Sequence, residues 1–249
     1  MKVIDTHCDL LYKMQTIKQA TGKLVSFRSD PLLDVNLLRL QAGGVFLQFF
    51  ALFTDPNRKV AHRWELILEQ IRLFEEEILA KYKQIKQIKK WSDIGRLKRG
   101  EIGAVLSLEG IEPIGEDLSK LHYLFHKGVL SVGLTWNQSN TAASGVLAPL
   151  DQGLTKFGEE IIALNNKYGV ITDLSHLGMR SFWEVLERAT YVFASHSNLY
   201  TVCPHRRNLT DIQVHSLFAK GGHVHFCFYP PFIDLTGKDS LDALIQHFI

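Results

Sequence analysis

The chain has little cysteine, no long apolar run and no excess of charge of one sign. Its three cysteines, Cys8, Cys203 and Cys227, are an odd number at scattered positions, which does not predict a framework of disulfide bonds. No apolar stretch approaches the roughly 18–20 residues of a membrane-spanning helix, and we expect no secretory signal, because no basic segment with an apolar core opens the chain. The formal net charge of +2 gives no electrostatic reason for binding to nucleic acid or to an anionic membrane. We therefore expect a cytoplasmic protein that binds neither.

Several catalytic motifs are missing as well. There is no Gly-x-Ser-x-Gly turn around a nucleophilic serine and no Gly-x-x-x-x-Gly-Lys loop for phosphate. The first apolar run, in "KVIDTHCDLL", is not followed by a glycine-rich turn, which argues against a doubly wound sheet that binds a dinucleotide. The chain is otherwise typical of a globular protein, with 46% hydrophobic and 22% charged residues.

Short apolar runs alternate with longer helical patterns along the whole chain. The predicted strands, rich in β-branched or aromatic residues, are "VIDTHCD", "GGVFLQFFALF", "GAVLSLEG", "VLSVGLTW", "GVITDLSH", "YVFASHS" and "HVHFCFY". The predicted helices cover 64–85, where apolar residues recur at helical spacing, and 154–169, 181–189 and 210–222. The glycines that follow helical patterns and precede strands, as helix C-terminal caps do, are Gly43, Gly128, Gly169 and Gly221.

This alternation predicts parallel strands and an α/β fold. No internal repeat, low-complexity segment or linker divides the chain, so we expect a single domain over residues 1–249. With the doubly wound sheet disfavoured, the expected architecture is a (β/α)8 barrel of the TIM type. Such barrels place their chemistry at the C-terminal ends of the strands.

Ligand-type side chains do follow the predicted strands at those ends. Asp5, His7 and Asp9 alternate along the first strand and would share one face of it. Imidazole nitrogens and carboxylate oxygens at four strand ends are the ligands that zinc and similar ions take, and the set suffices for two ions with one bridging carboxylate. The candidate ligands are His7, Asp9, Glu109, His176 and His196.

Each candidate also has a structural interpretation when taken alone. His7 and Asp9 could form an ordinary salt bridge, and His176 or His196 could be a hydrogen-bonded structural histidine. Their common position at successive strand ends favours the metal site. The same test argues against the remaining histidines: the pair at 122 and 126 belongs on an outer helix, and the pair at 223 and 225 lies at the start of a strand.

The chain resembles the membrane (renal-type) dipeptidases, a family of zinc-dependent hydrolases on a (β/α)8 barrel. The motifs that carry the resemblance occur in family order over nearly the whole chain: "DTHCDLL", "LQAGGVFLQFFALF", "SLEGIEPIG", "GLTWNQSN", "ITDLSHLG", "SHSNLYTVCPHRRNLTD" and "GGHVHFCFYPPFI". The first strand carries His-x-Asp, whereas zinc amidohydrolases of other types more usually carry His-x-His there. The resemblance implies two Zn²⁺ ions per chain, a dipeptide substrate and attack on the peptide carbonyl by a hydroxide that bridges the metals. A homodimer is compatible with it.

The resemblance also assigns roles to residues. His7 and Asp9 would hold one zinc ion, His176 and His196 the other, and Glu109 would bridge both as the catalytic carboxylate. Arg207 would bind the C-terminal carboxylate of the substrate, a role that suits a guanidinium fork. The other substrate-binding residues that we expect are Trp136, Asn137 and Tyr229, the last at the end of the seventh strand.

Two departures from the family pattern stand out. Trp136 occupies the position where renal-type members carry a histidine near the developing oxyanion, and indole cannot relay a proton. The eighth strand of the barrel, with the Asp that serves as acid and base for the leaving amine, is missing, so we expect a C-terminally incomplete domain of weak activity. Two alternatives to a dipeptidase therefore stay open: a catalytically impaired metal-binding fragment or pseudoenzyme, and another amide hydrolase acting on acylated amino acids.

Overall fold

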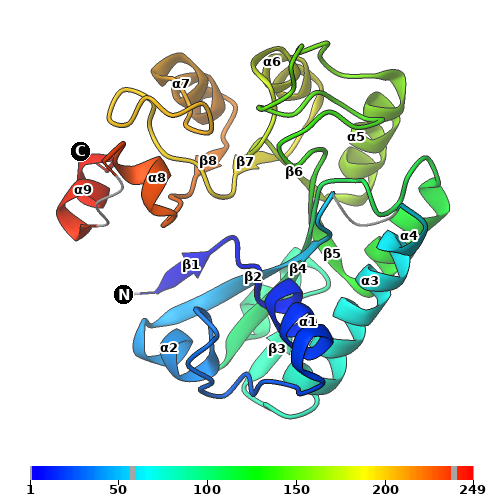
Figure 1. Ribbon diagram of the computed structural model, residues 1–249, viewed down its shortest axis with the longest axis vertical. Coiled ribbons are helices and arrows are strands. Elements are labelled where there is room, and N and C mark those ends of the chain that lie inside the picture. Colours follow the sequence, from blue (N-terminus) through cyan, green and yellow to red (C-terminus); the bar gives the residue numbers. More distant parts are fainter. Residues whose placement is uncertain (1, 57–59, 237–239, 249) are drawn as a thin grey trace. The chain divides into compact units, whose positions relative to one another are not determined.

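A computed structural model describes residues 2–56, 60–236 and 240–248, and it divides the chain into two compact units, Met1–Ser131 and Val132–Ile249 (Figure 1). The single domain expected over residues 1–249 stays a prediction. Within the described ranges, no helix combines the length and the apolar character needed to cross a membrane.

The first unit is built on parallel strands. Strands β1, β2, β4 and β5 lie in that order, and the short strand β3 pairs with β4. Their bounds are β1 (Val3–Asp5), β2 (Val45–Phe53), β3 (Ile85–Gln87), β4 (Ile102–Glu109) and β5 (Val129–Gly133). The central strands β2 and β4 read as continuous apolar runs because helices and neighbouring strands bury both of their faces.

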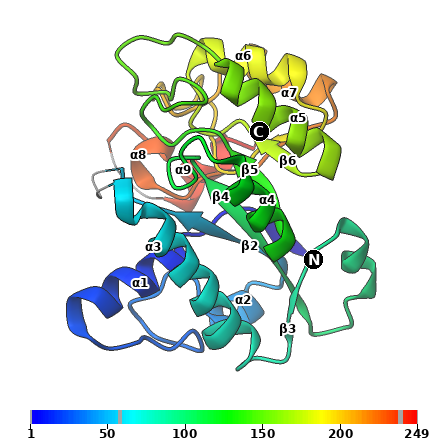
Figure 2. The ribbon, with the colours of Figure 1, turned by 90° about the vertical axis from the view of Figure 1, so that its right-hand side faces the viewer.

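Helices cover this sheet and complete the core of the first unit. They are α1 (Leu10–Thr21), α2 (Leu37–Ala42), α3 (Val60–Leu73), which continues as a π-helical segment (Phe74–Leu79), a 3-10 segment (Trp91–Arg96) and α4 (Leu118–Lys127). Helix α1 packs against both β2 and α3 (Figure 2). The ring of Phe50 on β2 is fully buried, with its centroid 5.5 Å from that of Phe74 and 6.2 Å from that of Phe27.

The second unit has three short parallel strands in the order β6-β7-β8. They are β6 (Ile171–Asp173), β7 (Val192–Ala194) and β8 (His223–Val224). Its helices are α5 (Lys156–Tyr168), α6 (Met179–Arg188), α7 (Asp211–Ala219), α8 (Pro230–Ile233) and α9 (Leu241–Gln246). Helix α5 packs on β6 and α6, and α7 packs on β8.

Capping residues explain why the helix boundaries were readable from the sequence. Thr155 accepts a hydrogen bond from the backbone N–H of Gly158 at the start of α5, and Thr210 forms a capping box with Gln213 at the start of α7. Gly169 ends α5 in the left-handed conformation, with φ 65°, where a side chain would be strained.

All seven predicted strand regions contain a strand, and β3 is an addition that the sequence did not reveal. Ile85, which was assigned to the long helix beginning at Trp64, lies in β3, so that part of the prediction was wrong. Its apolar side chain fits the helical spacing by coincidence and is buried in the sheet instead.

Two strands end earlier than predicted, which changes the interpretation of residues near them. Strand β1 ends at Asp5, so the alternation of a strand does not place His7 and Asp9 on one face. Strand β8 ends at Val224, and Tyr229 is therefore the residue before α8 rather than the end of a strand. The two prolines that follow Tyr229 favour the first turn of a helix.

Candidate functional site

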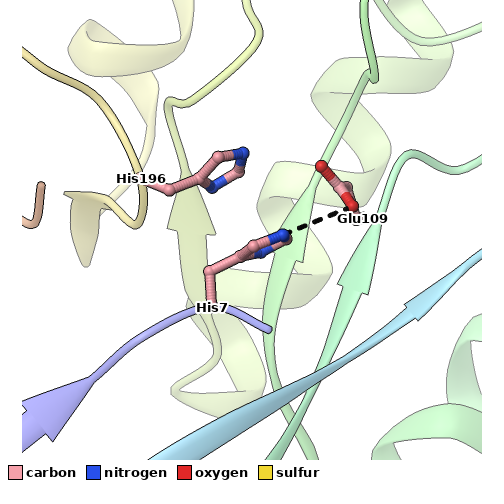
Figure 3. Close-up of side chains that lie close together, drawn as sticks. All are labelled: His7, Glu109 and His196. Atoms are coloured by element: carbon pink, nitrogen blue, oxygen red, sulfur yellow. Dashed lines mark ion pairs between the residues drawn. The ribbon is translucent and has the colours of Figure 1, made fainter. Parts of the chain in front are cut away.

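In the first unit, ligand-type side chains come together where β1 and β4 end. Glu109 is the last residue of β4, and His7 lies in the turn between β1 and α1. The Nε2 atom of His7 lies 3.7 Å from Oε2 of Glu109 and 3.6 Å from Oδ2 of Asp9 (Figure 3 shows the pair of His7 and Glu109). The side chains of His7 and Glu109 are only 15% and 10% exposed, so the two groups are held in a largely buried pair.

The turn that carries His7 and Asp9 is fixed by contacts on both sides of it. The backbone N–H of His7 donates to Asp5, and the Cys8 thiol donates to the carbonyl oxygen of Phe49 on β2. Asp9 immediately precedes α1. Desolvation raises the pKa of the Asp9 carboxyl, but the nearby His7 outweighs it, and the net pKa lies below its usual value.

The parallel register between β2 and β4 sets the position of Glu109. Phe53, the last residue of β2, is the register partner of Glu109. The fully buried amide of Gln70 on α3 accepts from the N–H of Phe53 and donates to its carbonyl oxygen. Gln70 therefore closes the end of β2 at the level where Glu109 leaves the sheet.

In the second unit, the two predicted histidine ligands face each other. His176 follows β6, His196 follows β7, and their Nε2 atoms lie 2.7 Å apart. Both side chains are buried, with 7% and 8% exposure. The arrangement brings together two of the residues that the sequence placed at strand ends.

The other ring nitrogen of each imidazole lies against a dedicated oxygen atom. Nδ1 of His176 is 2.8 Å from the amide oxygen of Asn137, and Nδ1 of His196 is 2.7 Å from the hydroxyl oxygen of Ser195. That hydroxyl donates its hydrogen to Asp173, so His196 must donate to it through Nδ1–H. An amide oxygen is only an acceptor, so His176 also donates through Nδ1–H, and both Nε2 atoms carry lone pairs.

Two lone pairs that face each other in a buried place fit a metal ion well. Nitrogens that each lie 2.0–2.1 Å from a tetrahedral zinc ion are about 3.3 Å apart, so the rings need to separate by only about 0.6 Å. Metal-binding histidines usually donate their other ring N–H to an oxygen acceptor, as both do in this unit.

The backbone at His176 is in a conformation that favours glycine. Its φ is 71°, the one positive value for a residue other than glycine within the described ranges. The N–H of Val146 donates to the carbonyl oxygen of His176 at 2.8 Å, and the hydroxyl of Thr135 donates to the same oxygen at 3.3 Å. These bonds hold the strained residue, and strain of this kind gathers at functional sites.

Arg207 is a buried cation in the same unit. It is 3% exposed, its Nη2 atom donates to the carbonyl oxygen of His196, and its guanidinium lies 5.4 Å from the ring centre of Phe232. Arg207 and His176 both line a cavity of about 550 Å³, together with Arg206 and Tyr200. This volume falls in the range of small-molecule sites.

The remaining predicted substrate-binding residues also lie in the second unit. The ring of Trp136 lies beside that of His176, with 6.2 Å between centroids, and Asn137 contacts His176 as described above. Tyr229 is 57% exposed, and its ring packs edge-on against that of Phe232. Their contacts with a substrate stay predictions.

The histidines that were excluded from the metal site lie where the sequence indicated. His122 and His126 are on α4, and His223 and His225 are at the start of β8 or directly after it. Burial, with a further contribution from His223, lowers the pKa of His225 to about 4, so this imidazole is neutral at physiological pH.

Ser195 and Asp173 are the residues that sequence reasoning missed. Asp173 accepts hydrogen bonds from the backbone N–H groups of Ser175 and Ser195 as well as from the Ser195 hydroxyl. The hydroxyl directly before His196 in "SHS" was a weak signal. Only the pairing of β6 with β7 brings Asp173 within its reach.

Buried histidines and acidic residues at the ends of parallel strands define an α/β protein of the metallohydrolase type. The chain matches the family model of the membrane dipeptidases, peptidase family M19, over residues 1–249, and it belongs to that family. An uncharacterized dipeptidase of Schizosaccharomyces pombe is 30% identical over the whole chain, which spans 64% of the length of that relative.

Solved structures show the same fold. The crystal structure of dipeptidase AC, a metallo peptidase of family M19, superposes with a TM-score of 0.87 and 23% identity, covering 100% of this chain and 80% of that chain. A metallo peptidase from Rhodobacter sphaeroides, bound to a phosphinate mimic of the dipeptide L-Ala-D-Ala, gives the same TM-score and identity and is covered to 81%. The predicted fold class, α/β of the (β/α)8 type with the eighth strand incomplete, is confirmed.

Proposed function

We propose that the protein is a zinc-dependent dipeptidase that hydrolyses the peptide bond of dipeptides. The observation that carries this proposal is the match to the dipeptidase family over the whole chain, together with ligand-type side chains at the strand ends that the family uses. The relative bound to a mimic of L-Ala-D-Ala supports a dipeptide as the substrate class.

The metal centre would consist of two Zn²⁺ ions. His7 and Asp9 would hold one, His176 and His196 the other, and Glu109 would bridge them. The buried pair of His7 and Glu109 supports the first set, and the facing Nε2 atoms of His176 and His196 support the second. Bound divalent ions would supply an activated water at neutral pH and would polarise the scissile carbonyl.

Residues of the chain itself would bind and orient the dipeptide. The buried guanidinium of Arg207 would pair with the C-terminal carboxylate of the substrate, for which a planar fork of N–H donors is suited. Trp136, beside His176, and Tyr229 would line the substrate site. Direct contact of Asn137 with substrate, a homodimer and a cytoplasmic location stay predictions.

Metal analysis combined with a peptidase assay tests this function. Purified full-length chain in zinc-supplemented buffer should contain up to two zinc equivalents, and the variant His176→Ala should lose one of them. The matched control His122→Ala removes a histidine from the outer helix α4 and should keep both. Folded protein that holds no zinc would contradict the metal centre.

The assay should also separate a dipeptidase from the two alternatives. A dipeptidase releases both amino acids from an unblocked dipeptide. Turnover of N-acylated amino acids with none of dipeptides would indicate another amide hydrolase. Zinc binding without turnover of either substrate would indicate a metal-binding protein with impaired catalysis.

A further inference from the structure

We propose that Asn137 and the pair of Asp173 and Ser195 are positioning residues that hold the imidazoles of His176 and His196 in one tautomer, ready for a single metal ion. The inference rests on the proposed function in that it takes these two histidines as metal ligands. It goes further by assigning a task to three side chains that touch no reacting atom.

The hydrogen bonds on the His196 side run in one direction only. The Asp173 carboxylate cannot donate, so the Ser195 hydroxyl donates to it and keeps its own lone pairs for His196. Asp173 is itself held by the backbone N–H groups of Ser175 and Ser195, each 3.0 Å from Oδ1. Ser195 thereby receives the Nδ1–H of His196 from a fixed direction, and Nε2 is left as the ligand atom.

His176 is held from three directions. Its Nδ1 atom meets the amide oxygen of Asn137 at 2.8 Å, and its carbonyl oxygen accepts hydrogen bonds from Val146 and Thr135. The chain around Asn137 is fixed in turn, because the N–H of Leu147 donates to the carbonyl oxygen of Asn137 at 2.8 Å. These contacts balance the strain of a φ of 71° and set the ring orientation.

Both sets of contacts serve the same end. Without an acceptor at Nδ1, a neutral imidazole can carry its proton on either nitrogen, and a proton on Nε2 blocks the ligand position. Facing lone pairs repel each other in the absence of a cation, so the second unit stores an arrangement that a divalent ion relieves. Loss of such outer contacts typically costs 10–100-fold in metal affinity.

The test compares tautomers and metal affinity in the full-length chain. Nitrogen-15 spectra of the metal-free protein at about pH 8, where an ordinary imidazole is neutral, should show the Nδ1–H tautomer for both histidines, assigned with His176→Gln and His196→Gln. The variant Ser195→Ala should shift His196 toward a mixture of tautomers and leave His176 unchanged. Asn137→Ala should do the reverse, and Asn137→Asp, which keeps an acceptor oxygen, should restore the Nδ1–H form.

Zinc titration against a competing chelator supplies the second measurement. Ser195→Ala and Asn137→Ala should each weaken one of the zinc sites by about 10-fold or more. The control Ser197→Ala removes an equally buried hydroxyl that contacts Ser175 and neither imidazole, so its zinc affinity and tautomers should match those of the unmutated protein.

The possible outcomes separate this inference from the proposed function. Unmutated protein that binds no zinc but shows both Nδ1–H tautomers, sensitive to Ser195→Ala and Asn137→Ala, would leave the positioning role intact and refute the metal centre. Zinc binding with unchanged affinity and unchanged tautomers in the folded Ser195→Ala and Asn137→Ala variants would overturn the positioning role.

Discussion

Arg207 offers a sharp test of substrate recognition because the chain places a matched control beside it. Arg207 is 3% exposed, whereas its neighbour Arg206 is exposed, and both line the same cavity. If the guanidinium of Arg207 pairs with the substrate carboxylate, its removal strands a charge in a place shielded from water. Truncating one partner of a buried charge pair costs about 2–5 kcal/mol, which corresponds to roughly 30- to 4,000-fold in affinity.

The change has a structural component that the assay must separate. Arg207→Ala also removes the hydrogen bond to the carbonyl oxygen of His196 and the contact with the Phe232 ring. Those losses weaken binding of every ligand equally, whether or not it has a free carboxylate. A comparison of a dipeptide with its C-terminal amide therefore isolates the charge pair, in the manner of a double-mutant cycle.

Calorimetric titration of the zinc-loaded full-length chain provides the measurement. The unmutated protein should bind the free dipeptide far more tightly than the amide, and Arg207→Ala should erase most of this preference. Arg206→Ala should retain it, because an exposed charge is screened by solvent. Equal binding of acid and amide by the unmutated protein, or an equal effect of both arginine variants, would refute the role of Arg207.

Two further predictions concern stability. His225 has a pKa of about 4 in the fold, below its value of about 6.5 in an unfolded chain, so the fold disfavours its protonated form. Its contribution should be complete above about pH 6.5 and should be lost as the pH falls toward 4; urea unfolding of His225→Phe should show a weaker decline over this window, while the exposed His215→Phe should behave as the unmutated protein does. Gln70→Leu should lower the free energy of unfolding by about 2–4 kcal/mol, because it leaves the buried N–H and carbonyl of Phe53 without their amide partner. Gln41→Leu on exposed α2 should change it by less than about 0.5 kcal/mol, and an equal loss in both variants would contradict the role assigned to Gln70.

The order of strands and helices could be predicted from the sequence because local signals mark it. Apolar runs mark β2 and β4, and capping residues such as Thr155 and Gly169 mark the ends of α5. The candidate ligands were found in the same way, since Glu109, His176 and His196 stand directly at or just after strand ends. Each of these features depends on residues close together in the chain.

What only the tertiary structure decided depends on contacts between distant segments. Whether Ile85 continues a helix or enters a strand is settled by its pairing with Ile102, and the local spacing of apolar residues cannot report that partner. Likewise, Ser195 becomes an anchor for His196 only because the pairing of β6 with β7 brings Asp173 to its hydroxyl. Sequence thus determined which side chains could bind a metal, and the fold decided which nitrogen each imidazole presents, because hydrogen-bond direction is fixed by neighbours that are far apart in the chain.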